Sequence, residues 1–243
     1  VPDEIKSSTG FLLISGGDRK DKEPEDANEL IRTLAIKTGT IAMSLHNVPN
    51  QPTTFVGDSD NQRYEDALIA YGWRKFMEEG AGEQSLEWLA RMPMTRAAVR
   101  AMDSATDYAK TLNHNVEKYV VAGGSKRGWT TWTTAIADDR VVAIAPIVID
   151  LLNLTPSFFH HWKAYGFWAP AVDDYVNEGI MEWFDSVEFA KLQEAVEPYS
   201  YKDQLTLPKM LINASGDQFF LPDSWQFYWS DLVGEKNIRY VPN

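Results

Sequence analysis

The chain has 243 residues, of which 44% are hydrophobic and 12% aromatic, and this composition suits one globular domain over residues 1–243. Its net charge of −12 repels phosphate backbones and anionic lipid headgroups, so neither nucleic-acid binding nor membrane-surface binding is expected. The sequence holds no cysteine, which excludes disulfides, thiolate metal sites and a cysteine nucleophile. No stretch is long and apolar enough to predict a membrane span.

Short apolar runs alternate with helical periodicities, which predicts a mainly parallel sheet with helices on both faces. Strands are expected at 11–14, 40–45, 118–122, 141–149 and 209–214, and a last one begins at 238. Helices are expected around 27–34, 69–76, 98–112 and 126–138, with a loop over 47–61. Asp26 is the expected cap of the first helix. Four threonines and two tryptophans make the helix at 126–138 locally unfavourable, so packing must override propensity there.

Residues 151–201 interrupt this alternation. They hold twelve Phe, Trp or Tyr side chains in about fifty positions, roughly twice the average of the chain. The segment is predicted to be a mostly helical cap inserted between two strands. Its rings either line a pocket for an apolar or sugar-like group or simply pack the cap against the sheet.

The strongest chemical signal is Gly123-Gly124-Ser125, which follows an apolar strand and precedes a helix. In the nucleophile elbow of an α/β-hydrolase, a serine on such a turn stands exposed at the sheet edge. Arg127 occupies position +2, where the common G-x-S-x-G form has glycine, and the next glycine is Gly128. The elbow therefore requires this arginine to point away from the sheet. A plain structural turn is the alternative, whereas the glycine-rich phosphate-loop motifs are absent.

The second signal is Asp217, which follows the apolar strand 209–214 and a glycine turn. An α/β-hydrolase places the carboxylate that orients its histidine here, in the chain order Ser, Asp, His. Two alternatives remain at this point. Asp217 caps the turn near 221–225, or Asp150, at the end of the preceding strand, is the acid.

The amides of Gly17, after the first strand, and Lys126, after the serine, are the expected oxyanion-hole donors. The side chain of Lys126 either adds positive charge there or faces solvent. None of the four histidines suits the triad: His46 and His114 suit structural roles, and His160 and His161 precede Asp217. Within the cap, the candidate substrate-binding residues are His160, His161, Trp162 and Trp168.

The run Ala122-Gly-Gly-Ser-Lys-Arg-Gly-Trp-Thr-Thr-Trp132 and the Asp139-Arg140-Val141 that follows resemble the signature of the PhoPQ-activated pathogenicity-related protein family. That family includes secreted autocrine proliferation repressor proteins. Residues 214–223 resemble its second conserved block, and residues 239–243 resemble the start of its third. The resemblance implies an α/β-hydrolase fold, an exported protein that is periplasmic or secreted, a nucleophile at Ser125 and an acid at Asp217. It also implies a histidine shortly after residue 243, and first strands that precede residue 1.

The residues and the resemblance together lead to a serine hydrolase acting on an ester or peptide bond of a small-molecule or peptide substrate. No metal or organic cofactor is required. With its histidine outside 1–243, the chain is expected to be inactive alone. The other hypothesis is a secreted signalling or binding protein, with a cell-surface partner, that uses a hydrolase scaffold without catalysis.

Overall fold

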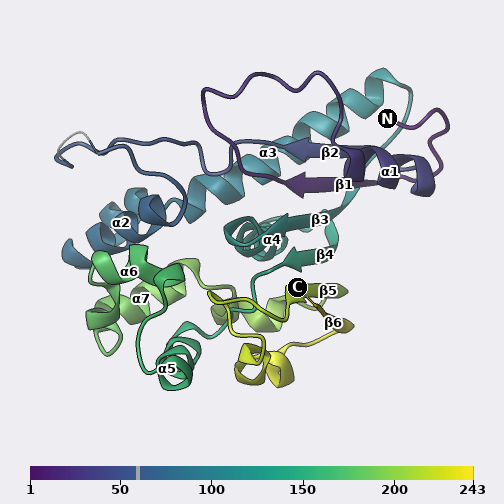
Figure 1. The fold of residues 1–243 in the computed structure, drawn as a ribbon. Coiled ribbons are helices and arrows are strands. Elements are labelled where there is room, and N and C mark those ends of the chain that lie inside the picture. Colours follow the sequence, from purple (N-terminus) through teal and green to yellow (C-terminus); the bar gives the residue numbers. More distant parts are fainter. Residues whose placement is uncertain (59–60, 243) are drawn as a thin grey trace.

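A computed structural model describes residues 1–58 and 61–242 of the chain. The predicted α/β-hydrolase-type architecture is confirmed: six strands form one sheet in the order β2-β1-β3-β4-β5-β6, and every neighbouring pair is parallel (Figure 1). The strands are β1 (Thr9–Ile14), β2 (Ala42–Leu45), β3 (Lys118–Gly124), β4 (Val141–Ile147), β5 (Lys209–Ala214) and β6 (Lys236–Val241).

Helices cover both faces of this sheet. The main ones outside the cap are α1 (Glu29–Thr38), α2 (Glu65–Glu78), α3 (Arg91–Thr111) and α4 (Lys126–Ala137). From β1 the chain moves to β2 at one edge of the sheet, and from β2 it moves the other way, to β3 and then to β4. Because connections between parallel strands are right-handed, α1 lies on one face of the sheet, and α3 and α4 lie on the other. The expected cap at Asp26 is wrong. Asn28 caps α1 instead, because its side-chain oxygen accepts from the amides of Leu30 and Ile31.

Packing explains why α4 is a helix despite its composition. Trp129 and Trp132 are almost completely buried, and each belongs to a different one of the two hydrophobic clusters. Thr130 and Thr134 donate their hydroxyls to the carbonyls four residues earlier, which satisfies these side chains inside the helix. Helix α4 contacts β3 and β4 along its length, so tertiary burial overrides the β propensity of its residues.

Between β4 and β5 the chain forms the cap, whose helices are α5 (Leu154–Tyr165), α6 (Asp173–Asn177) and α7 (Val187–Val196). Figure 1 shows α6 and α7 beside α2, which contacts both, and α5 further from α2. Glu197, at the end of α7, is buried and accepts from the amide of Leu154 at 2.5 Å and the amide of the Gln193 side chain at 2.9 Å. One carboxylate therefore ties α5 to α7. Within 1–58 and 61–242, no helix has both the length and the apolar composition that a bilayer crossing needs.

Burial raises the pKa of Glu197 to about 7, although hydrogen bonds from Leu154 and Gln193 lower it. Because the folded pKa exceeds the unfolded one, its contribution to stability is present below pH ~4.5 and is lost as pH rises through about 7. We expect the stability of the native chain relative to Glu197→Gln to fall across this interval by on the order of 2 kcal/mol. Urea unfolding from pH 4 to 8 measures it. The exposed Glu194→Gln is the matched control, and an equal pH trend in both variants would contradict the assignment.

Candidate active site

Ser125 lies directly between the end of β3 at Gly124 and the start of α4 at Lys126. Its backbone has φ 54° and ψ −123°, a conformation that costs about 1–3 kcal/mol for a residue other than glycine. The Ser125 amide donates to the carbonyl of Ile147 at 2.8 Å, which fixes the turn against the end of β4. This is the strand-to-helix turn that the sequence predicts, with the strain typical of a nucleophile elbow.

Two glycines allow the turn to close. A Cβ atom at Gly123 would lie 2.5 Å from the carbonyl oxygen of Arg127. At Gly128 it would lie 2.6 Å from Cγ2 of Ile149 and 3.0 Å from the carbonyl oxygen of Gly123. Strand β3 and helix α4 therefore approach each other more closely than any side chain permits, and Gly128 takes the steric role that the G-x-S-x-G form gives to position +2.

Arg127 leaves the elbow instead of crowding it. Its guanidinium donates two hydrogen bonds to the carboxylate of Glu65, at 2.6 and 2.7 Å, and its Nε donates to the carbonyl of Val48. The side chain covers Gly16 at the end of β1, where a Cβ atom would lie 2.6 Å from the guanidinium. The elbow requires Arg127 to point away from the sheet, and a bidentate ion pair with Glu65 at the start of α2 holds it in that direction.

Lys126 is buried, so a solvent-facing side chain is the wrong reading of this residue. Its ammonium lies 2.7 Å from a carboxylate oxygen of Glu65 and 2.8 Å from one of Asp66. Burial would raise the pKa of Glu65, but hydrogen bonds from Arg127, Lys126 and Gln51 outweigh it and lower the pKa to about 2. The two cations that follow Ser125 are thus neutralised by two adjacent carboxylates at the start of α2.

A small cavity of about 10 Å³ lies at Ser125. Its wall includes the ion-paired Lys126 and Asp66, the buried Arg91, and Tyr175 of the cap, whose hydroxyl donates to Asp66 at 3.0 Å. Aromatic and aliphatic groups complete it: Trp73, Trp129, Ile149, Leu151, Phe158, Phe219 and Phe220. Sequence reasoning missed Glu65, Asp66, Arg91 and Tyr175, and the only local signal was the acidic pair Glu65-Asp66 opening a helix.

The two expected oxyanion donors follow the ends of neighbouring strands. Lys126 is the first residue of α4, where a helical amide has no acceptor within its own helix. Gly17 follows β1, which pairs with β3, and its carbonyl accepts from the Gln51 side chain at 2.7 Å. Gln51 also donates to Glu65 at 2.7 Å, so the loop at Gly17 is attached to the same ion-pair cluster.

Both candidate acids are fixed by hydrogen bonds, but in different ways. One carboxylate oxygen of Asp217 accepts from the amides of Phe219 at 2.8 Å and Phe220 at 3.0 Å, so this side chain caps the turn directly after it and not the turn or helix near 221–225. Asp150 is 1% exposed, and its two oxygens accept from the hydroxyls of Tyr228 and Tyr240. Burial raises the pKa of Asp150 to about 6, despite those two hydrogen bonds.

The cap histidines are engaged away from the serine. Nε2 of His160 lies 2.8 Å from a carboxylate oxygen of Asp223. His161 is buried and accepts from the amide of Ala169 at 3.1 Å, and burial lowers its pKa. In the part of the chain that the structure describes, neither imidazole is hydrogen-bonded to Ser125, as the sequence interpretation expects.

The four cap residues expected to bind substrate do not line the cavity at Ser125 within the described residues. Trp162 is 45% exposed, and its ring centroid lies 5.1 Å from that of Trp168, which also stacks on His161. Of the residues on α5, Phe158 lines the cavity at Ser125. The buried His161 lines an adjoining small cavity with Phe158 and Phe219. The cap's contribution at Ser125 therefore comes from Leu151, Phe158 and Tyr175.

The parallel sheet, the strained serine turn after β3 and the aspartate after β5 define an α/β-hydrolase. Solved structures agree on the fold. Acetyl xylan esterases from Paenibacillus sp. R4 and Thermoanaerobacterium sp. align over 98% of this chain and 69% of theirs, with TM-scores of 0.62 and 0.59 and 14% identity. An acylaminoacyl peptidase of Pyrococcus horikoshii aligns over 99% of this chain and 33% of its own, with a TM-score of 0.53 and 13% identity.

The chain belongs to the PhoPQ-activated pathogenicity-related protein family, whose sequence profile matches residues 1–243. Autocrine proliferation repressor protein A of Dictyostelium discoideum is 42% identical over 246 aligned residues, which cover all of this chain and 49% of that protein. The resemblance in the serine motif is thereby confirmed at the level of the family. The chain spans about half the length of this curated relative.

The close approach at Gly128 predicts a specific stability effect. Gly128→Ala should lower the free energy of unfolding by about 1–3 kcal/mol, because the added methyl group overlaps Ile149 and separates β3 from α4. Gly82→Ala is the matched control, since nothing lies within 4 Å of its Cβ position and its change should stay within about 0.5 kcal/mol. Urea unfolding measures both, and equal stabilities of the two variants would refute the steric role of Gly128.

Proposed function

We propose that the protein is a serine hydrolase that cleaves an ester or peptide bond, with Ser125 as nucleophile. The observation that carries this proposal is the strained conformation of Ser125 at a strand-to-helix turn, beside a cavity. Strain of this kind persists only where the surrounding structure enforces it, and here glycines and a buried ion-pair cluster do so. Structural neighbours that are esterases and peptidases support the hydrolase scaffold.

In the proposed reaction, Oγ of Ser125 bonds to the substrate carbonyl carbon as a histidine outside residues 1–243 takes its proton. The amides of Lys126 and Gly17 stabilise the oxyanion, and Asp217 orients the histidine. The histidine then protonates the leaving alcohol or amine, and water cleaves the acyl-enzyme to release the acid and regenerate Ser125. Lys126 and Arg127 act as positioning residues, because their charges are neutralised by Glu65 and Asp66.

We further propose that the substrate is a small molecule or peptide with a short acyl group. The cavity at Ser125 has the space of about one water molecule, and the buried rings around it leave no room for a long chain. Export from the cell is part of the same proposal, and it is supported by the relationship to autocrine proliferation repressor protein A.

The first test of this proposal compares residues 1–243 with a chain extended through the native C-terminus. A fluorophosphonate probe should label the extended chain at Ser125, and Ser125→Ala should remove the label. Residues 1–243 alone, without a base, should react slower by several orders of magnitude. Asp217→Asn should slow ester hydrolysis by about 10⁴-fold, whereas Asp150→Asn should have a much smaller effect. Mass spectrometry identifies the labelled residue. Equal labelling of Ser125→Ala would exclude the proposed nucleophile.

The second test addresses the acyl group. In the extended chain, kcat/KM for p-nitrophenyl acetate should exceed that for p-nitrophenyl octanoate by at least about tenfold, because the longer chain clashes with the cavity wall. Phe219→Ala removes one ring of that wall, so it should bring the kcat/KM values of the two esters closer together. Phe159→Ala is the control, since this ring is 44% exposed and lies outside the cavity. A native enzyme that prefers the octanoyl ester would contradict the size argument.

A secreted signalling or binding protein with a cell-surface partner is the second candidate. The observation that favours it is the 42% identity to a protein named an autocrine proliferation repressor. The same labelling experiment separates the two functions, because a pure binding protein has no activated serine. If the extended chain stays unlabelled while it represses proliferation, the second candidate is correct.

A further inference from the structure

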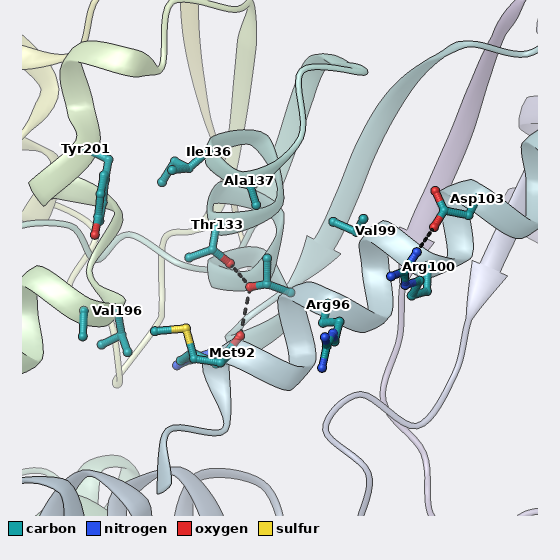
Figure 2. Close-up of a pocket in the computed structure, with 13 residues that line it drawn as sticks. Met92, Arg96, Val99, Arg100, Asp103, Thr133, Ile136, Ala137, Val196 and Tyr201 are labelled. Atoms are coloured by element: carbon teal, nitrogen blue, oxygen red, sulfur yellow. Dashed lines mark hydrogen bonds and ion pairs between the residues drawn. The ribbon is translucent and has the colours of Figure 1, made fainter. Parts of the chain in front are cut away.

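A second and larger cavity lies away from the hydroxyl of Ser125, in a groove formed by α3, α4 and the end of the cap. Its volume is about 550 Å³, within the range of small-molecule sites. Figure 2 shows Val99 on α3, Thr133 and Ile136 on α4, and Val196 and Tyr201 from the cap around this space. Thr133 is 8 residues beyond Ser125, which places it about 12 Å further along the axis of α4, although Arg91 lines both the groove and the cavity at Ser125.

The groove is electropositive on an acidic protein. Three arginines line it, Arg91, Arg96 and Arg100, against the single carboxylate of Asp103, whereas the whole chain carries a net charge of −12. Asp103 is shared, at 2.8 Å from a nitrogen of Arg100 and 2.8 Å from one of Arg140. Arg96 takes part in no ion pair within 1–58 and 61–242. The groove therefore presents an excess of positive charge beside apolar side chains.

Arg91 supplies the second observation. It is 3% exposed, its guanidinium lies 4.5 Å from the ring centre of Trp129, and one terminal nitrogen donates to the carbonyl of Lys126 at 2.8 Å. Its Nε is buried without a hydrogen-bond partner in the described structure. Its side chain thus lies between the groove and the cavity at Ser125, both of which it lines.

We propose that this groove binds a small amphiphilic carboxylate, with its apolar body against Met92, Val99, Ile136 and Val196 and its carboxylate among the arginines. Arginine is the side chain best suited to a carboxylate, because its planar fork donates two parallel hydrogen bonds. The groove shares only Arg91 with the lining of the cavity at Ser125, and binding there does not depend on hydrolysis. Its cavity accommodates an eight-carbon chain, which the cavity of about 10 Å³ at Ser125 does not.

The test is calorimetric titration of the 243-residue chain with sodium octanoate, and with octanamide as an uncharged probe of the same length. Octanoate should bind one site saturably, more tightly than octanamide by about tenfold, and more weakly as salt rises. Arg96→Gln with Arg100→Gln should weaken octanoate binding by about fivefold or more. Arg32→Gln is the matched control, since Arg32 is an exposed arginine on α1. Ser125→Ala should leave binding unchanged.

Val99→Trp provides an independent variant, because the larger ring fills the groove and should abolish binding without altering any charge. Circular dichroism of each variant establishes that it is folded. The proposal is overturned if octanoate does not bind saturably, if octanamide binds equally well, or if Arg32→Gln weakens binding as much as the groove variants. Should a groove variant fail to fold, the comparison of octanoate with octanamide on the native chain still decides the outcome.

Discussion

The arrangement around Ser125 depends on one buried cluster of charges. Lys126 and Arg127, which follow the serine, both bind Glu65, and Lys126 also binds Asp66. Burying these cations without partners would be unfavourable by several kcal/mol each, so the two carboxylates are a condition for α4 to begin where it does. The cluster joins the first turn of α4 to the start of α2, so it fixes the helix that follows the strained turn. Gln51 extends the same network to the carbonyl of Gly17.

The cluster explains how an elbow with bulky residues can exist. In the common motif, small residues let strand and helix approach, and here Gly123 and Gly128 still provide that approach. The side chains between them find room by extending outwards, Arg127 over the end of β1 and Lys126 towards α2. Stability of the turn and orientation of its amides thus come from one set of interactions. A substitution of Glu65 would therefore affect both the stability of the turn and the orientation of its amides.

Local patterns in the sequence were sufficient for the elements and for the serine turn. Apolar runs and helical spacing depend on neighbouring residues, and each strand and helix predicted outside the cap is present, although α3 begins at Arg91, 7 residues before its predicted start. Partners distant in sequence were not predictable: nothing near Lys126 indicates that Glu65, 61 positions earlier, neutralises it. The cap shows the same limit. Its aromatic excess predicted a packed helical segment, but which rings face Ser125 depends on how α5 lies against Phe219 and Tyr175, which only the tertiary structure determines.

The choice between the two candidate acids follows from what each carboxylate already binds. Asp150 is enclosed by Tyr228 and Tyr240, and burial raises its pKa to about 6, so its environment disfavours the negative charge that stabilises an imidazolium. Asp217 instead receives two backbone amides on one oxygen, and these hydrogen bonds fix the direction of the carboxylate. It also follows β5, which pairs with β6 within residues 61–242. Because parallel strands end on the same side of a sheet, a histidine placed after β6, as the proposed mechanism requires, would lie at the edge where Asp217 and Ser125 follow their own strands.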